Sequence, residues 1–400
     1  MITVRNITNK KIKIIFIPVL ICLILIIPIL FSGCTQEQEI KKHYLENYEE
    51  IVESYALGKK WIVDNVNDKG YFNYVYDPST LEYSSNNNMI RQLMGSRLLA
   101  ELSQENISLQ NLHQKNLDAV FNYWYRENGN IGYIYFSSKS KLGAMAMMLR
   151  TLVYSPFFEN YTEEAKKLAN CILYLQNNDG SFNPWYIEPG YSYDEDYLLT
   201  FYSGEALLSL VEYYDKTGNM TVYDAMIKSQ NYYVERYVEN LSEHYYPAYV
   251  PWHTQSLNKI YKNTNDSRYA DVIFTLNDEL LKIQDTTNKK TLGRFYNASH
   301  HEYGSPHSSS DGVYTEGLAY AYEIAQLVND TTHMKKYKAA IQLGCDNIIS
   351  LQYNEENSKS FEFPERIIGA VRYNIDDYRI RVDTTQHILD GYLKILSLFD

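Results

Sequence analysis

CILYLQNNDGSF, residues 171–182, has the pattern of a helix end that runs into a tight turn and then an aromatic residue. Leu173 and Leu175 are apolar, and the Asn, Asp and Gly residues after Gln176 favour a turn over a helix. The same pattern occurs five more times along the chain. The other copies are WIVDNVNDKGYF (61–72), FNYWYRENGNIGY (121–133), YYVERYVENLSEHYY (232–246), LLKIQDTTNKKTLGRF (280–295) and IISLQYNEENSKSF (348–361).

Six aromatic residues close these stretches, and they recur 49 to 66 residues apart. Regular recurrence in this range is typical of a repeat architecture. The stretch at 171–182 is therefore interpreted as the third of six equivalent turns. The closing residues are Phe72, Tyr133, Phe182, Tyr246, Phe295 and Phe361.

A second set of six helices is predicted between these markers, with apolar residues at i, i+3, i+4 and i+7. They are rich in Ala, Gly and Leu, whereas the first set, such as TEEAKKLANCILYL (162–175), carries more Lys and Glu. Each repeat is therefore a helical hairpin with one buried and one more solvated helix. The buried set is MIRQLMGSRLLAEL (89–102), KLGAMAMMLRTLVY (141–154), GEALLSLVEYY (204–214), HTQSLNKIY (253–261), TEGLAYAYEIAQLV (315–328) and TTQHILDGYLKILSLF (384–399).

Six hairpins of this kind resemble an all-α (α/α)6 toroid, and we predict one such domain over residues 46–400. An open solenoid is the alternative. A solenoid needs polar capping repeats, and the sixth hairpin here is as apolar as the middle ones.

The first 33 residues have the features of an export signal. A basic segment precedes an apolar run from Ile14 to Phe31, and Ser32-Gly33-Cys34 follows it. This arrangement resembles the lipobox of prokaryotic lipoproteins, which implies cleavage before Cys34 and lipidation of that residue. Residues 34–45 would then be a tether, and the protein would sit on the extracytoplasmic face of the cell membrane. The alternative is an uncleaved anchor, for which the apolar run is just long enough.

The charge of the exported part argues against a nucleic-acid partner. Without residues 1–33 the chain holds 33 Lys and Arg against 49 Asp and Glu, a net charge of −16. Besides the lipidation candidate Cys34, two cysteines remain there, Cys171 and Cys345. They can form one disulfide outside the cell or stay as two buried free thiols.

One rim of the predicted toroid is expected to carry the chemistry. The inner helices run parallel, so all six helix N-termini and the loops before them gather there. Four of these loops are long, at 73–87, 183–200, 296–312 and 362–380, and long polar loops often carry function. The first turns of the predicted inner helices hold Arg91, Lys141, Glu205, His253, Glu316 and Asp383.

Five residues of this rim are the candidate acid and base groups. They are Glu205, Glu316, Asp383, His253 and His387. Structural explanations without catalysis exist for four of them. Acids near helix N-termini are favoured by the helix dipole, and Asp383 can also form an ion pair with Arg381 that closes the ring. His253 can be a structural histidine whose hydrogen bonds are satisfied. Asp383 and His387 lie one turn apart, so Asp383 could orient His387.

The candidate substrate-binding groups are cations, which could hold an anionic substrate, and aromatic rings, which can stack on the apolar faces of sugars. They are Arg91, Lys141, Arg381, Trp185, Trp252 and Tyr314. The segment HHEYGSPHSSSDG (300–312) lacks strict metal-ligand spacing, and we interpret its histidines as exposed loop residues. YSYDEDY (191–197) is interpreted as a solvated acidic run. We expect no metal and no cofactor, since no nucleotide-binding motif occurs.

The repeat pattern and the aromatic rim together resemble carbohydrate-active toroids, namely six-hairpin glycoside hydrolases, polysaccharide lyases and sugar epimerases. The resemblance implies a glycan in the central cavity, acted on by carboxylate or histidine acid–base chemistry. Two other classes remain open, because a fold does not fix a function. One is a non-catalytic glycan-binding or scaffold lipoprotein, and the other is a terpene-cyclase-like toroid, which export and the lack of a strong Asp-rich motif disfavour.

Overall fold

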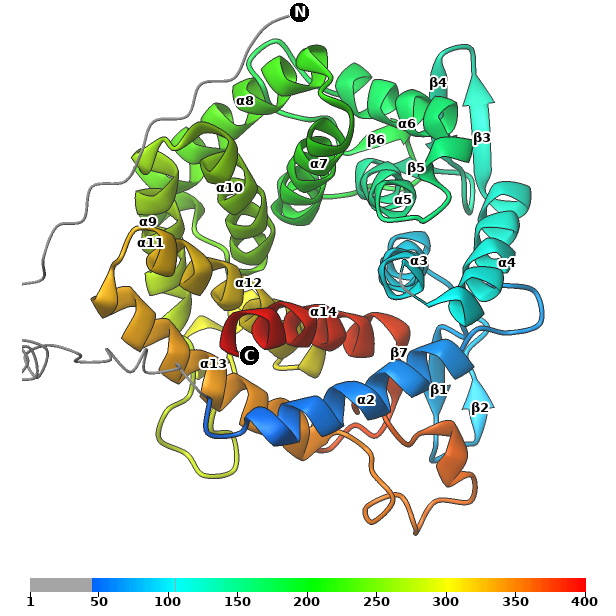
Figure 1. Ribbon diagram of the computed structural model, residues 1–400, viewed down its shortest axis with the longest axis vertical. Coiled ribbons are helices and arrows are strands. Elements are labelled where there is room, and N and C mark those ends of the chain that lie inside the picture. The colour runs from blue at the N-terminus through cyan, green and yellow to red at the C-terminus, as the bar shows by residue number, and fades with distance from the viewer. Residues whose placement is uncertain (1–44, 105) are drawn as a thin grey trace, which may run out of the picture. The chain divides into compact units, whose positions relative to one another are not determined.

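The computed structural model describes residues 45–104 and 106–400, which form one compact unit. In this part of the chain, outer and inner helices alternate, and Figure 1 shows the inner set arranged around a common centre. The outer helices are α2 (Tyr48–Asp64), α4 (Ile107–Tyr123), α6 (Thr162–Tyr174), α8 (Met220–Val234), α11 (Ser267–Leu281) and α13 (Thr331–Leu351). The inner helices are α3 (Met89–Ser103), α5 (Leu142–Val153), α7 (Glu195–Thr217), α10 (Val250–Thr264), α12 (Ser308–Leu327) and α14 (Val382–Phe399).

The ring of inner helices is closed. Each inner helix packs on the next, and the last one, α14, packs on both α12 and α3 (Figure 1). The predicted (α/α)6 toroid is confirmed, and the open solenoid is excluded by the α14–α3 contact. The composition explains the layering: every residue of α5 from Leu142 to Leu152 is buried, whereas α6 buries only one face.

The turn at residues 176–182 docks the third hairpin onto the next outer helix, α8. Gln176 and Phe182 form a β-bridge, and the Gln176 amide donates to the Ala225 carbonyl of α8 at 2.7 Å. Gly180 adopts φ +100°, and a Cβ there would lie 2.7 Å from the Lys228 carbonyl oxygen. Only glycine fits such a position without strain.

The same docking recurs at three other glycines with positive φ, but not in every hairpin. Gly70 and Gly293 precede the predicted Phe72 and Phe295, which bridge to Val66 and Gln284. In the sixth hairpin the bridging residue is Val371, after Gly369, and not the predicted Phe361. The second hairpin replaces the turn with an antiparallel pair, β3 (Tyr125–Asn128) and β4 (Ile131–Ile134), and in the fourth a π-helical turn, η2 (Glu235–Glu239), extends α8.

Short strands join the loops along the rim. Strands β1 (Val75–Asp77), β2 (Glu82–Tyr83) and β7 (Ile380–Arg381) form an antiparallel sheet in the order β2-β1-β7. Val75 pairs with Arg381, so the first and last hairpins are also linked through this sheet. Strands β5 (Ser140–Lys141) and β6 (Trp185–Ile187) pair in the same way, with Lys141 opposite Trp185.

Two inner helices begin earlier than the sequence pattern predicts. Helix α7 starts at Glu195, where the Asp194 side chain accepts from the Tyr197 N–H at 3.0 Å, and α12 starts at Ser308, capped by His307. The loops predicted at 183–200 and 296–312 are correspondingly shorter. Glu205 and Glu316 therefore lie about two to three turns inside their helices, below the rim, and not in the first turns.

The two cysteines are free and buried, so the disulfide alternative is not adopted. Burial raises the pKa of the Cys171 thiol to about 12. Across residues 45–104 and 106–400, no helix combines the length and apolar character needed to cross a bilayer. The predicted signal at 1–33, lipidation at Cys34 and nearly all of the 34–45 tether lie outside the described residues.

Candidate functional site

A cavity of about 470 Å³ opens where the N-terminal parts of the inner helices converge. Every inner helix, or the residue that caps it, contributes to its wall. The ionisable residues on the wall are Arg91, Lys141, Glu205, His307, Arg381, Asp383 and His387. The aromatic residues on the wall are Tyr197, Phe201, Tyr202, Tyr246, Trp252, Tyr303, Tyr314 and Tyr373.

Glu205 is a buried carboxyl group in this wall, with 2% of its surface exposed. Its Oε2 atom has no hydrogen-bond partner among the described residues and lies against Gly143 of α5. Burial raises its pKa to about 8, because the cations Arg150, Lys141 and Arg91 offset the desolvation only in part. Glu205 therefore carries a proton at neutral pH and can donate it.

Asp383 is the opposite case on the same wall. Its carboxylate lies 3.0 Å from Nε of Arg381 and 3.2 Å from Nε of Arg91. Burial alone would raise its pKa, but these two guanidinium groups hold the pKa well below its usual range. Asp383 is therefore ionised, and the ion pair with Arg381 considered from the sequence is present, though on the cavity wall.

His387 and Glu316 form a pair that the sequence did not indicate. Nδ1 of His387 lies 3.6 Å from Oε2 of Glu316, and neither atom has a hydrogen-bond partner in the part of the chain that the structure describes. His387 lines the cavity and meets the Trp252 ring edge-on at 5.6 Å. Glu316 lies behind it, buried and off the wall. The carboxylate that faces Nδ1 of His387 is thus Glu316, at a distance just beyond a hydrogen bond, while Asp383 directs its oxygens to two arginines.

The wall carries more positive than negative charge. Lys141 makes no ion pair within the described residues, and its ammonium group lies 5.7 Å from the Trp185 ring and 6.0 Å from the Tyr202 ring. Burial, helped by repulsion from Lys139, lowers its pKa. With Glu205 protonated, Asp383 is the one ionised carboxylate among the lining residues, so the cavity favours an anionic ligand.

His253 does not line the cavity. It is buried behind the wall, its Nε2 lies 3.1 Å from the Ser203 hydroxyl, and burial lowers its pKa to about 3. This matches the structural explanation given for it from the sequence. Trp185 also stands back from the wall, where it supports Lys141, whereas Trp252 and Tyr314 lie on the wall itself.

The histidine-rich segment divides into two parts. His300 and His301 are exposed, as the sequence indicated, but His307 is on the cavity wall, which the sequence did not indicate. Nδ1 of His307 accepts from the Ser310 N–H at 3.1 Å, and its ring stacks on Tyr373 at 5.0 Å. Burial, then the nearby Arg381, lowers its pKa to about 4, so it is neutral. No group of three potential metal-ligating residues is found within the described part of the chain.

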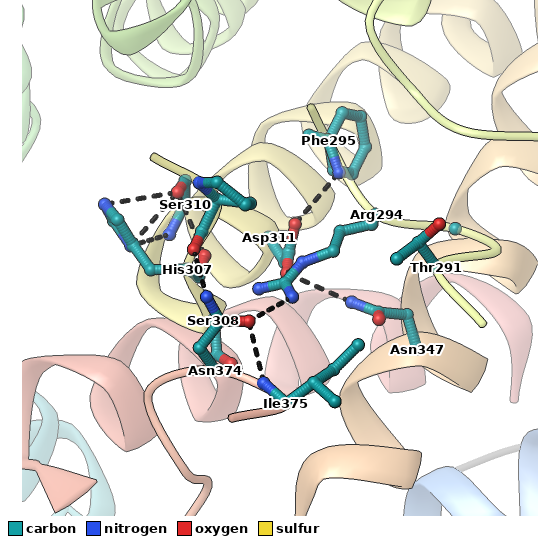
Figure 2. A network of polar contacts seen from close by, with 12 residues as sticks. Thr291, Arg294, Phe295, His307, Ser308, Ser310, Asp311, Asn347, Asn374 and Ile375 are labelled. Atoms are coloured by element: carbon teal, nitrogen blue, oxygen red, sulfur yellow. Dashed lines mark hydrogen bonds and ion pairs between the residues drawn. The ribbon is translucent and has the colours of Figure 1, made fainter. Parts of the chain in front are cut away.

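A buried polar network holds this side of the wall in place (Figure 2). Asp311 accepts from the Phe295 N–H at 2.9 Å and from the Asn347 amide at 3.1 Å, and it pairs with Arg294 at 3.3 Å. Arg294 also donates to Asn374, whose amide reaches the Pro306 carbonyl at 3.0 Å. The loops before α12 and α14 are thereby tied together beneath His307.

No family model matches the sequence, and no curated protein matches it. Solved structures do match the fold. A D-mannose isomerase superposes with a TM-score of 0.65 at 11% identity, covering 88% of this chain and 97% of that one. An unsaturated glucuronyl hydrolase from Streptococcus agalactiae superposes with a TM-score of 0.61 at 12% identity, covering 89% of this chain and 97% of that one. The third structure is an inactive variant of an α-1,6-mannanase from Salegentibacter in complex with α-1,6-mannotriose. It superposes with a TM-score of 0.62 at 10% identity, covering 88% of this chain and 99% of that one. At these identities the similarity establishes the shared toroid fold.

Proposed function

We propose that this protein is a carbohydrate-active enzyme that binds an acidic sugar chain in the central cavity and uses Glu205 as its proton donor. The observation that carries the proposal is the contrast between two carboxyl groups on one wall. Glu205 is kept neutral by burial, and Asp383 is kept ionised by two arginines. Paired groups whose pKa values are pushed apart are typical of acid–base catalysis.

The partner of the acid is His387, which Glu316 would orient. Its free ring nitrogen would take a proton from the substrate or from water while Glu205 delivers one to the departing or accepting oxygen. Lys141, Arg91 and Arg381 would receive the sugar carboxylate, and Trp252 and Tyr314 would pack against the sugar rings. Hydrolysis, elimination and epimerisation each use a proton donor and a proton acceptor. The anion-binding groups would add a preference for carboxylated sugars.

The fold supports a sugar substrate. The three matching structures are named as an isomerase of mannose, a hydrolase of unsaturated glucuronyl groups and a mannanase with a bound oligosaccharide. We further propose that the enzyme is exported and held at the cell membrane through lipidated Cys34, as the sequence of the first 34 residues predicts.

The test uses the full-length protein in a sugar-free detergent against uronate-containing and neutral oligosaccharides. New reducing ends would identify hydrolysis, absorbance of a new carbon–carbon double bond would identify elimination, and changed proton NMR signals without cleavage would identify epimerisation. Glu205→Gln should abolish the product, while Glu163→Gln, an exposed acid on α6, should not. Binding without any product would favour a glycan-binding lipoprotein, and full activity of Glu205→Gln would remove its assigned role.

A further inference from the structure

A second pocket of about 390 Å³ lies next to the central cavity, on the rim between α7 and the π-helical turn after α8. The two hollows share Tyr197 and Tyr246, whose rings meet edge-on at 6.2 Å. Tyr197 is 50% exposed. The two tyrosines therefore form a ridge with one hollow on each side, so a linear ligand that leaves the cavity over this ridge enters the second pocket.

The floor of this pocket is aromatic. Tyr232 meets Tyr233 edge-on at 5.0 Å, and the Tyr233 ring stacks on Phe182 at 6.1 Å. The Phe182 N–H donates to the Tyr233 hydroxyl at 3.1 Å, so the helix-end turn of the third hairpin fixes the floor. π-Helical turns such as η2 are frequent at functional sites.

The charge of the second pocket is opposite to that of the central cavity. Its acidic residues are Asp194, Glu195, Asp196 and Glu243, and its one Lys or Arg is Arg236. Arg236 is already paired with Asp196 at 2.9 Å. Glu195 and Glu243 make no ion pair within the described residues, so they are free to accept hydrogen bonds from hydroxyl or ammonium groups and would repel a carboxylate.

We infer that this pocket is a second sugar-binding subsite, which takes a carboxylate-free sugar ring of the same chain whose acidic ring occupies the central cavity. Tyr232 would stack on the ring, and Glu195 and Glu243 would accept its hydroxyl protons. The inference rests on the proposed function and adds to it a substrate in which an acidic sugar adjoins a neutral or amine-bearing one.

The experiment is a calorimetric titration of the full-length protein, in a sugar-free detergent, with carboxylate-free tetrasaccharides of glucose, mannose, N-acetylglucosamine and glucosamine, and with a tetramer of galacturonate. At least one carboxylate-free tetramer should bind, and Tyr232→Ala should raise its Kd about tenfold. Tyr174→Ala, which removes a 69%-exposed tyrosine on α6 outside both pockets, should leave the Kd unchanged. Glu243→Lys should improve binding of the galacturonate tetramer.

The outcomes separate this inference from the proposed function. Binding that depends on Tyr232 without any turnover would support the subsite and contradict the enzyme. Turnover with no dependence of Kd on Tyr232 would overturn the subsite alone. Failure of every carboxylate-free tetramer to bind would overturn the subsite as well, whatever the acidic substrates do.

Discussion

Oxygen Oε2 of Glu205 on α7 packs directly against Gly143 on the neighbouring inner helix α5. A Cβ at position 143 would occupy the space that this oxygen fills. Because Gly143 has no side chain, the helix leaves room for a carboxyl group in the wall, and no donor from residues 45–104 or 106–400 reaches that oxygen. The neutral state assigned to Glu205 thus depends on a glycine 62 positions earlier in the chain.

Gly143→Ala is expected to lower kcat/KM by about ten- to a hundredfold, because the added methyl group displaces the Glu205 carboxyl, and small misplacements of catalytic groups have effects of this size. Overpacking should also lower the free energy of unfolding by about 1–3 kcal/mol. Kinetics and thermal unfolding of the variant would be compared with Gly190→Ala, where a Cβ meets open space. Unchanged kinetics would show that Glu205 does not need this position.

The raised pKa of Glu205 should affect how both activity and stability depend on pH. As a proton donor, it should lose activity as pH rises through about 8. Its folded-state pKa lies above the ordinary 4.5, so its contribution to stability is fully present below about pH 4.5 and is lost as pH rises towards 8. The melting temperature of the native protein should therefore fall relative to Glu205→Gln across this interval. A constant difference would contradict the assignment.

Glu316→Gln should lower kcat about ten- to a hundredfold with little change in KM, since Glu316 lies behind His387 and does not line the cavity. His387→Asn, which removes the base itself, should lower kcat further. The double variant should be no slower than His387→Asn if Glu316 acts only through the histidine. Steady-state kinetics on all three proteins decides this, and additive losses would argue for independent roles.

Lys141→Gln should weaken binding of carboxylated substrates by about ten- to a hundredfold, the usual effect of losing a hydrogen bond to a charged group. Neutral oligosaccharides should bind as before. Lys166→Gln is the matched control, because Lys166 is exposed on α6 and lies off the cavity wall. Equal losses for carboxylated and neutral ligands in Lys141→Gln would mean that Lys141 is structural.

The fold could be predicted from the sequence because short-range sequence patterns specify its helices and turns. Apolar spacing of 3.6 residues marks the helices, and turn residues after Gln176 and its counterparts mark the hairpin ends. Counting these events predicts six hairpins without knowledge of any long-range contact. The sixth marker, Phe361, was misplaced because the bridge of that hairpin forms ten residues later, at Val371, after a longer loop.

The site was less predictable because its pairings are long-range. The sequence placed Glu205, Asp383 and His387 near one rim, but burial sets the protonation of Glu205, and the partner of His387 lies 71 positions away at Glu316. The role of His307 could not be predicted for the same reason. Nothing in a Ser-rich loop indicates that the Arg294–Asp311 pair will hold this loop, and with it His307, beside the cavity.

Below the cavity, the ring is held by a buried ion pair between α5 and α7. Arg150 donates to Glu212 at 2.6 and 3.1 Å, the Tyr154 hydroxyl donates to the same carboxylate at 3.0 Å, and both charged side chains are about 95% or more buried. Arg150→Met leaves the Glu212 charge without its main partner and should cost about 3–5 kcal/mol of unfolding free energy. Replacing both residues with Met should recover most of that loss.

The matched control is Arg268→Met, which breaks an exposed pair with Asp266 and should cost at most about 1 kcal/mol. Urea unfolding of the native protein, Arg150→Met, the double Met variant and Arg268→Met measures the free energy of unfolding of each. If Arg150→Met is as stable as Arg268→Met, the charge on Glu212 must be relieved by Lys259, which lies 3.9 Å away, or by proton uptake. Repeating the urea titration at higher pH separates the two explanations. Only proton uptake becomes less favourable as pH rises, so only then should Arg150→Met lose stability at higher pH.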